Sequence, residues 1–376
     1  MVSKIKRREN TDKTTISTTN NHLLSNITNN KIFNYLMRDN IMNSNFFKRV
    51  ILAIIMLTLF SFISKYKVAI SILIYFIKIF TYKEIIDIHQ KHRRKGSFYF
   101  LLWYFLFLSD IFLFKYSFKY LNVFGMEYIF RHFNFFCFSC YIGGLIFFII
   151  HLKKGNLKIQ FIQFAISHLS IILINLPSHL AIHNTMKSRY WFCYPTLLVI
   201  ANDIFAYMVG KTLGRTPLIK LSPKKTLEGY IGGIILTAIF GILINYLTIT
   251  QNIFISNNDL LKIDGYRYIL GIKIHRLWIH SLPFIFFASI IAPFGGFFAS
   301  GFKRLTRIKD FANYIPGHGG IADRMDCQYV MAIFTYVYIN TFIKEKKTVE
   351  QIALELLRKY DTTEIKQLLD ILKNSI

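Results

Sequence analysis

Residues 316–326, PGHGGIADRMD, bring together residue types that could bind an anion and a metal ion. The backbone N–H groups of a flexible glycine-rich turn can approach an oxyanion, and two aspartates three positions apart share one face of a helix. The stretch is therefore a candidate site for a charged ligand. Its candidate residues are His318, Gly319, Asp323, Arg324 and Asp326.

Basic residues precede this stretch at spacings that suit a phosphate-rich ligand. Ser300 and Lys303 share a helical face, Arg304 is adjacent, and Lys309 and Asp310 follow. Mg²⁺ takes one or two carboxylates and completes its shell with water and phosphate oxygens. Phosphoryl and nucleotidyl transfer need little beyond such a clamp and in-line positioning of the reacting groups. The simpler alternative is a network of Asp and Arg side chains at the surface.

A second basic stretch, LSPKKTLEGYIGG at 221–233, predicts a helix that starts among lysines. We expect Ser222 to be the N-cap, with Lys224 and Lys225 in the first turn and Glu228 placed to pair with Lys224 or orient it. Lysines there are unfavourable by a few tenths to about 1 kcal/mol each. An anion bound at the helix N-terminus would remove the conflict. Alternatively, the lysines only set the membrane topology.

The elements that position these residues are membrane helices. The chain is 53% hydrophobic, with a mean hydropathy of +0.38, 38 Phe and 22 Tyr, which is more apolar surface than a globular core can hide. Buried helices of a large soluble protein are the alternative. We predict an all-α polytopic integral membrane protein with about eight or nine transmembrane helices. The predicted spans are 49–64, 67–82, 98–116, 133–151, 159–176, 190–209, 229–249, 279–299 and a shorter run, 328–343.

The net charge of +26 is typical either of nucleic-acid binding or of loops that face anionic lipid. The distribution favours the second interpretation, and we expect no nucleic-acid partner. The basic loops follow spans two, four, six and eight, so all of them fall on the cytoplasmic side if the N-terminus is cytoplasmic. These loops are 89–96, 151–158, 211–226 and 303–310.

Three parts of the chain are expected. Residues 1–46 are rich in Asn and predict a disordered cytoplasmic tail. Residues 47–343 form the transmembrane catalytic domain. Residues 344–376 form a helical extension, in which helical periodicity occurs twice and indicates two short amphipathic helices.

Polar residues inside the predicted spans are functional candidates, because ionisable groups are costly in a bilayer. For Asp110 and His168 we favour simple bonding to a neighbouring helix. Asn202 and Asp203 lie near the basic loop at 211–226, and for them we favour a role in binding.

With these residues in view, the stretch 300–326 resembles the signature of the CDP-diacylglycerol synthases (phosphatidate cytidylyltransferases) of the eukaryotic type. The match comprises Ser, Lys-Arg, Lys-Asp, Pro-Gly-His-Gly-Gly and Asp-Arg-x-Asp at corresponding spacings. Residues 202–233 resemble the second block of that family, and the similarity runs from about residue 46 to the C-terminus. The resemblance implies formation of CDP-diacylglycerol and pyrophosphate from CTP and phosphatidate, with Mg²⁺. We expect an integral membrane protein, in the endoplasmic reticulum, with a cytoplasmic active site; a homodimer is left open.

The resemblance also implies roles for individual residues. Bacterial members have an aspartate at the position of Gly296, which supplies a carboxylate to the metal ion. That carboxylate is missing here, and Asp310 and Asp203 are candidate substitutes. The expected metal ligands are Asp323, Asp326 and Asp310. The expected catalytic residues are Asp323, Lys303, Arg304, Asp310 and Asp326. The expected substrate-binding residues are Ser222, Lys224, Lys225, Glu228, Ser300, Lys309, His318, Gly319, Arg324, Asn202 and Asp203.

Two rival functions are compatible with parts of the pattern. A CTP-dependent polyprenol or dolichol kinase would share basic loops and metal carboxylates but not the full signature. A transporter of anionic lipid would need polar residues along a path through the bilayer, whereas here the charged motifs gather at one rim. No Walker motif, kinase signature or G-x-S-x-G elbow occurs in the chain.

Overall fold

The computed structural model describes residues 55–56, 58–91, 99–117, 127–219, 222–255, 265–269, 272–308, 310–312, 319–343 and 360–374. The chain divides into two units, one of Met1–Ser61 with Pro316–His318 and one of Phe62–Ile315 with Gly319–Ile376. In the first unit, residues 55–56 and 58–61 are described and are helical. The predicted tail, 1–46, lies outside the described residues. All elements named below belong to the second unit.

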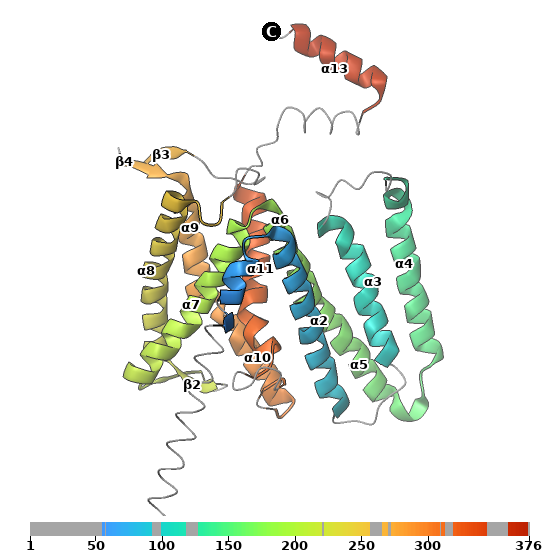
Figure 1. Cartoon of the computed structure of the whole chain (residues 1–376). Coiled ribbons are helices and arrows are strands. Elements are labelled where there is room, and N and C mark those ends of the chain that lie inside the picture. The colour runs from blue at the N-terminus through green and yellow to red at the C-terminus, as the bar shows by residue number, and fades with distance from the viewer. Residues whose placement is uncertain are drawn as a thin grey trace, which may run out of the picture. The chain divides into compact units, whose positions relative to one another are not determined.

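The second unit is built from helices, as the apolar runs predict (Figure 1). Helices α5 and α6, and helices α9 and α10, are each joined through a π-helical turn. The helices are α2 (Lys67–Lys91), α3 (Tyr99–Ser117), α4 (Glu127–Ile150), α5 (Leu157–Ser170), α6 (Leu176–Lys187), α7 (Tyr190–Leu213), α8 (Leu227–Gln251), α9 (Arg276–Phe286), α10 (Pro293–Leu305), α11 (Ala322–Phe342) and α13 (Thr362–Asn374).

Among the described residues, five helical segments are long and apolar enough to cross a membrane. The predicted class, a helical membrane protein, is confirmed, and the count of eight or nine spans stays a prediction. Helices α2 and α11 have the length to span, but each carries several charged residues. The five segments are His132–Ile150, Lys154–Lys187, Tyr190–Leu213, Leu227–Gln251 and Arg276–Leu305.

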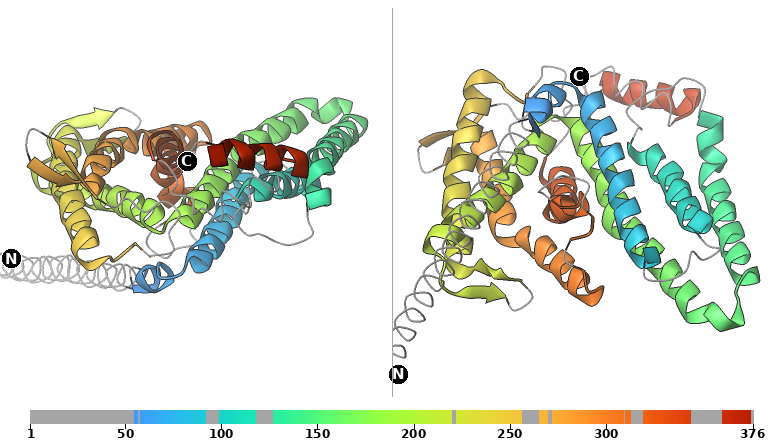
Figure 2. Two further views of the ribbon diagram at one scale, coloured as in Figure 1. Left: turned by 90° about the horizontal axis from the view of Figure 1, so that it is seen from above. Right: turned by 60° about the horizontal axis from the view of Figure 1, so that its bottom comes forward.

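Helix α8 has its apolar side chains on the outside. Its buried positions recur every three or four residues and hold glycine, threonine or asparagine, whereas Ile235 and Ile239 are 56% and 59% exposed. In lipid, large apolar residues can face outwards, and small residues allow helices to approach closely. Helix α8 accordingly packs along α7 (Figure 2).

Two prolines lie just after interruptions of the regular α-helix in the segments that contain the fifth and eighth predicted spans. Pro177 is the second residue of α6 and Pro293 is the first residue of α10, and a π-helical turn precedes each of them, at Ile171–Asn175 and Phe287–Ile291. Proline has no N–H with which to continue the regular hydrogen bonding. The helical segment that contains the fifth predicted span continues to Lys187 instead of ending near residue 176. It is longer than predicted because its polar residues, such as His179 and Asn184, are buried against other helices.

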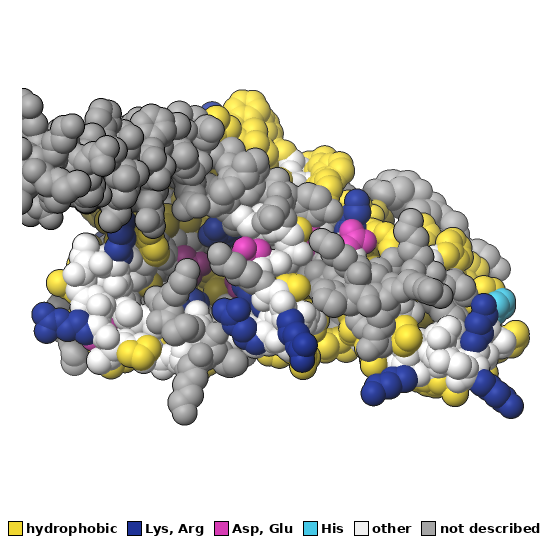
Figure 3. Space-filling model, turned by 90° about the horizontal axis from the view of Figure 1, so that it is seen from below, with side chains coloured by type: hydrophobic (Ala, Val, Ile, Leu, Met, Phe, Trp, Pro, Cys, Tyr) yellow, Lys and Arg dark blue, Asp and Glu magenta, His cyan; other side chains and the backbone are white. Residues whose placement is uncertain are grey.

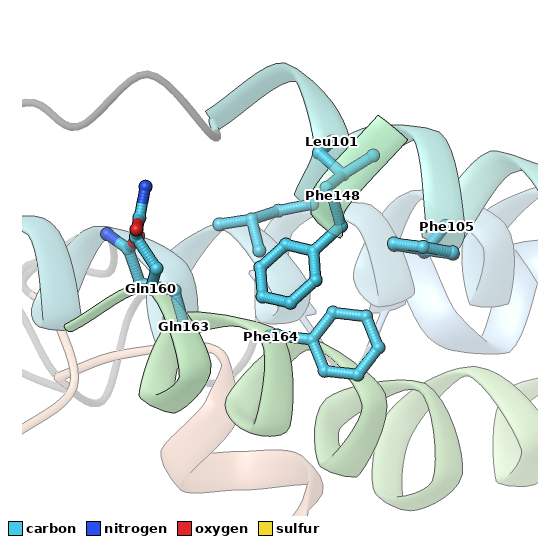
Figure 4. A pocket seen from close by; sticks show the side chains of 7 residues that line it. Leu101, Phe105, Phe148, Gln160, Gln163 and Phe164 are labelled. Carbon is cyan, nitrogen blue, oxygen red and sulfur yellow. The ribbon is translucent and has the colours of Figure 1, made fainter. Parts of the chain in front are cut away.

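Two of the core clusters among the described residues are rich in aromatic side chains. Tyr190, Trp191 and Tyr194 of α7 pack with Phe284 of α9 and Met331 of α11. The second cluster lies between α3, α4 and α5, where two buried glutamines adjoin stacked rings (Figure 4). The residues there include Leu101, Phe105, Phe148, Gln160, Gln163 and Phe164.

Buried charges also join helices. Asp110 of α3 accepts hydrogen bonds from Lys78 of α2 at 2.6 Å and from His179 of α6 at 3.1 Å. His168 of α5 lies 3.3 Å from the hydroxyl of Tyr141 on α4. Both contacts agree with the simpler interpretation, that Asp110 and His168 bond to neighbouring helices.

Two short antiparallel hairpins were not predicted. Strand β1 (Pro217–Ile219) pairs with β2 (Ser222–Thr226), and β3 (Tyr266–Ile269) pairs with β4 (Ile272–His275). They lie at opposite ends of the helices (Figure 1). The β1–β2 hairpin, the C-terminal ends of α2 and α10 and the α4–α5 connection share one end, as the alternation of basic loops predicts.

Candidate active site

Close packing of α7 on α8 fixes one side of the candidate site. A Cβ on Gly229 would lie 2.7 Å from the carbonyl oxygen of Ala206 and 2.9 Å from the Cα of Gly210, so only glycine fits there. The two helices therefore meet backbone to backbone. This contact sets Asp203 of α7 near Lys225, which lies on β2 directly before α8.

The helix after the basic stretch begins later than predicted. Strand pairing keeps the backbone extended from Ser222 to Thr226, and Thr226 is the N-cap, its hydroxyl accepting from Gly229 N at 3.2 Å. The prediction of Ser222 as N-cap is thus wrong, because the hairpin takes up the residues that the capping argument assigned to the first turn. Lys225 lies on a strand; the side chain of Lys224 is not among those described.

Glu228 anchors the hairpin to the start of α8. Its carboxylate accepts from the backbone N–H groups of Arg215 at 3.0 Å and Thr216 at 3.1 Å, and from the Thr216 hydroxyl at 2.7 Å. These bonds hold the chain before β1 against the first turn of α8. Its carboxylate therefore supports the strand that carries Lys225.

The two charged stretches meet at Gly296 of α10. A Cβ there would lie 3.3 Å from Lys225 Nζ, 3.4 Å from Asp326 Oδ2 and 3.3 Å from Cys327 Sγ. At the preceding residue, Gly295, a Cβ would lie 2.6 Å from the carbonyl oxygen of Asp326. Helices α10 and α11 therefore cross in backbone contact, and the crossing presents the Asp326 carboxylate to Lys225.

The carboxyl group of Asp326 has an unusual electrostatic environment. Asp326 precedes the apolar part of α11, and its pKa is raised to about 6. Burial among protein atoms is the largest cause, the nearby carboxylate of Asp203 acts in the same direction, and Lys225 opposes both. Asp203 is exposed and within electrostatic range of Lys225 and Arg324. Lys225 Nζ also lies 4.6 Å from the centre of the Phe297 ring, a favourable cation–π distance.

Asp323 has a different set of partners. Its Oδ1 accepts from Lys303 Nζ at 2.6 Å, and its Oδ2 accepts from the N–H groups of Phe311 at 3.1 Å and Gly320 at 3.2 Å. The side chains of Lys303 and Asp323 are 16% and 10% exposed. Asp323 therefore ties α10, the chain at Phe311 and the glycine-rich turn together.

The backbone N–H groups at the end of the glycine-rich turn face protein carboxylates. Ile321 and Ala322 donate to Glu84 of α2, each at 2.8 Å, and Gly320 donates to Asp323. Gly319 has a φ of 84°, in the left-handed region that favours glycine. At residues 320–322 the oxyanion-binding role predicted for the turn is thus taken by side chains of the protein itself.

The other predicted site residues take several positions. The Ser300 hydroxyl donates to the Gly296 carbonyl at 2.7 Å, and Arg304 is exposed on α10. Asn202 is buried and accepts from Thr237 of α8 at 3.3 Å, so it faces the α7–α8 contact. Asp310 is exposed, with Oδ1 at 3.7 Å from the Cβ position of Gly319. Two further predicted residues lie outside the described ranges: Lys309 and His318.

Sequence reasoning missed Glu84, Phe297 and Gly295. Glu84 lies between the predicted second span, 67–82, and the basic loop at 89–96, in a segment that received no prediction. Its signal was the presence of an acid at the end of an apolar run in a chain with only 20 acidic residues. Phe297 and Gly295 gave no signal beyond an apolar helix, since their roles depend on which helices cross.

The carboxylates near Lys225 suit a metal ion that takes most of its ligands from phosphate and water. Among the described residues, no group of three or more His, Cys, Asp or Glu side chains could hold a metal ion. Asp203 and Asp326 form a pair of carboxylates near one another, and Mg²⁺ needs only one or two when phosphate and water complete its shell. Acidic side chains lie between Lys and Arg on this end of the molecule (Figure 3).

Comparison with known proteins finds a matching family and several similar proteins. Residues 47–342 match the cytidylyltransferase family. The chain is 37% identical over 362 residues to the phosphatidate cytidylyltransferase of Encephalitozoon cuniculi, covering 89% of this chain and 88% of that protein. It is 35% identical over 339 residues to a putative phosphatidate cytidylyltransferase of Schizosaccharomyces pombe, covering 81% and 77%.

Mammalian relatives match over a shorter stretch. The chain is 46% identical over 232 residues to phosphatidate cytidylyltransferase 2 of Bos taurus, covering 55% of this chain and 52% of the relative. The match therefore spans about half the length of that relative.

Proposed function

This chain belongs to the cytidylyltransferase family, and we propose that it is a phosphatidate cytidylyltransferase of phospholipid biosynthesis. It transfers the cytidylyl group of CTP to phosphatidate, forming CDP-diacylglycerol and pyrophosphate. The observation that carries the proposal is the meeting of Lys225 with Asp326 across Gly296. Cationic and carboxylate groups at one membrane rim suit a reaction between a nucleoside triphosphate and the headgroup of a lipid.

The reaction requires the protein to bring two anions together. An oxygen of the phosphatidate phosphate attacks the α-phosphorus of CTP, and the bond from that phosphorus to the bridging oxygen breaks, with its electron pair leaving on pyrophosphate. The attacking phosphate is already anionic near neutral pH, so no strong general base is needed. Lys225 and Arg324 lower the repulsion between the anions, and orientation supplies much of the remaining rate.

We propose that a divalent ion, Mg²⁺, binds to Asp326 and Asp203. When bound, such an ion supplies charge neutralisation for the triphosphate and for the leaving pyrophosphate. Asp203 then supplies from α7 the carboxylate that bacterial members carry at the position of Gly296. Asp323, with both oxygens engaged, orients Lys303 and the glycine-rich turn, and Asp310 lies at the rim of the same turn.

The proposed location follows from the same arrangement. The protein is an integral membrane protein, and we place the site on the cytoplasmic face of the endoplasmic reticulum, where soluble CTP and a bilayer lipid both have access. The gathering of basic loops at the end that bears the site supports this orientation.

The test is a product analysis with purified full-length protein in detergent micelles that contain phosphatidate. With CTP and Mg²⁺ present, we expect a lipid that carries cytidine and an equimolar amount of pyrophosphate. A polyprenol or dolichol kinase would release CDP and make a phosphorylated prenol only when prenol is supplied. A transporter would yield no new lipid, and either result would reject the proposal.

A further inference from the structure

Helix α11 receives its N-terminal cap from a helix far away in the sequence. Its own N-cap residue, Ile321, makes no capping hydrogen bond through its side chain. Instead Glu84 of α2 accepts from Ile321 N through Oε1 and from Ala322 N through Oε2, each at 2.8 Å. The first N–H groups of a helix have no partner within it, and a carboxylate is favoured at this end of the helix dipole.

Gly320, directly before the start of α11, leaves room for this carboxylate. Glu84 is 1% exposed, and a Cβ on Gly320 would lie 2.8 Å from its Oε2 and 2.9 Å from the backbone nitrogen of Ala312. Any side chain at position 320 would push against the buried carboxylate. The contact therefore depends on both the acid of α2 and the glycine before α11.

Glu84 and Asp323 together bind three consecutive backbone N–H groups at the start of α11. Asp323 accepts from Gly320, and Glu84 accepts from the next two residues. Together the two carboxylates fix the start of α11, from which Asp323 and Asp326 project within the first turn and a half. A small shift or rotation of this start would move Asp326 away from Lys225.

Helix α2 has independent attachments, so Glu84 is not needed to hold α2 itself. The buried pair of Lys78 with Asp110 joins α2 to α3, and the Tyr82 hydroxyl donates to the Leu102 carbonyl at 2.7 Å. Replacement of Glu84 should therefore leave α2 in place and release the start of α11.

We propose that Glu84 is a positioning residue for the transfer reaction: it touches no substrate and sets the place of Asp326 by capping α11. The inference rests on the proposed function. Misplacement of reacting groups by about 1 Å can cost a factor of about 100 in rate, so the effect should fall on kcat.

The experiment compares Glu84→Gln with Tyr82→Phe in the purified full-length protein. Glutamine has the same size but turns an N–H₂ group towards one of the two backbone donors. Tyr82→Phe removes one buried hydrogen bond of the same helix, which is made to Leu102 of α3, and serves as the control for lost stability. Should Glu84→Gln not yield folded protein, Glu84→Asp, one methylene shorter with the charge kept, replaces it in the comparison.

We expect Glu84→Gln to lower kcat at least about tenfold, while the KM values for CTP and phosphatidate change less than about threefold. Hydrogen exchange should accelerate in the peptide that covers residues 319–326 and stay unchanged in α2. Tyr82→Phe should retain most of the kcat.

The proposal is overturned if Glu84→Gln keeps the wild-type kcat, if Tyr82→Phe loses as much kcat, or if exchange at 319–326 is unchanged. Absence of the cytidine lipid with wild-type protein would instead reject the proposed function, and the exchange comparison would still decide whether Glu84 caps α11.

Discussion

The proposed site depends most closely on the geometry around Gly296. Lys225 Nζ and Asp326 Oδ2 both lie within 3.4 Å of the position that its Cβ would take. A carboxylate on residue 296, as in the bacterial pattern, would enter the same space. In this chain the carboxylate of Asp203 on α7 is within electrostatic range of Lys225 and Asp326, and we propose that it takes the role of that missing group.

We predict that Asp326→Asn and Asp203→Asn each lower kcat/KM at least about 100-fold, about 2.7 kcal/mol of transition-state stabilisation. Asparagine keeps the size and loses the charge that would hold a divalent ion. The measurement is initial-rate kinetics over a range of Mg²⁺ concentrations, with melting temperature in detergent as the control for folding. Wild-type kinetics in both variants would contradict the assignment of the metal site.

Asp323→Asn separates the two roles that Asp323 could have. If Asp323 holds Lys303 and the turn, the variant loses activity, with a melting temperature below that of the wild type and an unchanged Mg²⁺ requirement. The side-chain amide cannot accept bonds from Lys303 and from both backbone donors at once. A large rise in the Mg²⁺ concentration for half-maximal rate, at unchanged melting temperature, would favour Asp323 as a metal ligand.

At the scale of residues, charge and spacing singled out Lys225, Asp323 and Asp326 as candidates but gave no information about their partners. The contacts of Glu84 with Ile321, 237 positions away, and of Lys225 with the Phe297 ring depend on how helices cross. Local spacing contains no information about such crossings.

At the scale of elements, the crossing of α10 and α11 should be sensitive to one glycine and tolerant at the next. A Cβ on Gly295 would lie 2.6 Å from a backbone oxygen that cannot move away, whereas Gly296 has its nearest neighbours at 3.3 Å, on side chains. We predict that Gly295→Ala lowers the melting temperature and abolishes activity, and that Gly296→Ala is much milder.

The matched control is Gly143→Ala on α4, where a Cβ would meet nothing within 4 Å. Thermal melting in detergent, followed by the activity assay, gives both readouts. Equal tolerance of alanine at Gly295 and Gly143 would show that α10 and α11 do not cross in the described way.

The start of α8 gives a second prediction at this scale. Loss of an N-cap side chain costs about 1 kcal/mol, so Thr226→Ala should lower stability by about that amount, whereas Ser222→Ala should change it by less than about 0.5 kcal/mol. Thermal melting of both variants in the same detergent checks the prediction. A larger loss for Ser222→Ala would mean that the helix begins at the earlier position.

The helices could be predicted because long apolar runs are a strong signal in a membrane chain. The β1–β2 hairpin could not be, since its strands of three and five residues contain prolines and lysines and show no alternation of apolar and polar residues. Ser222 followed by Pro223 is a good helix-start pattern locally. The pairing of β2 with β1 overrides that local preference.

At the scale of the whole molecule, the hairpins at the two ends of the helices give a test of topology. With the native cysteines replaced, Lys154→Cys and Arg215→Cys, at exposed positions of the end that bears the site, should react with a membrane-impermeant maleimide added to sealed microsomes. Tyr268→Cys, 74% exposed on β3 at the other end, should react only after the membrane is opened. Reversal of this pattern would place the site on the lumenal face.

The most direct measurement follows the label of CTP into lipid. Purified protein with phosphatidate and Mg²⁺ receives CTP labelled either in the α-phosphate or in the γ-phosphate. The account predicts that only the α-label enters the lipid, that the γ-label appears in pyrophosphate, and that Asp326→Asn abolishes both. Transfer of the γ-label to lipid, or label transfer that is unaffected by Asp326→Asn, would contradict it.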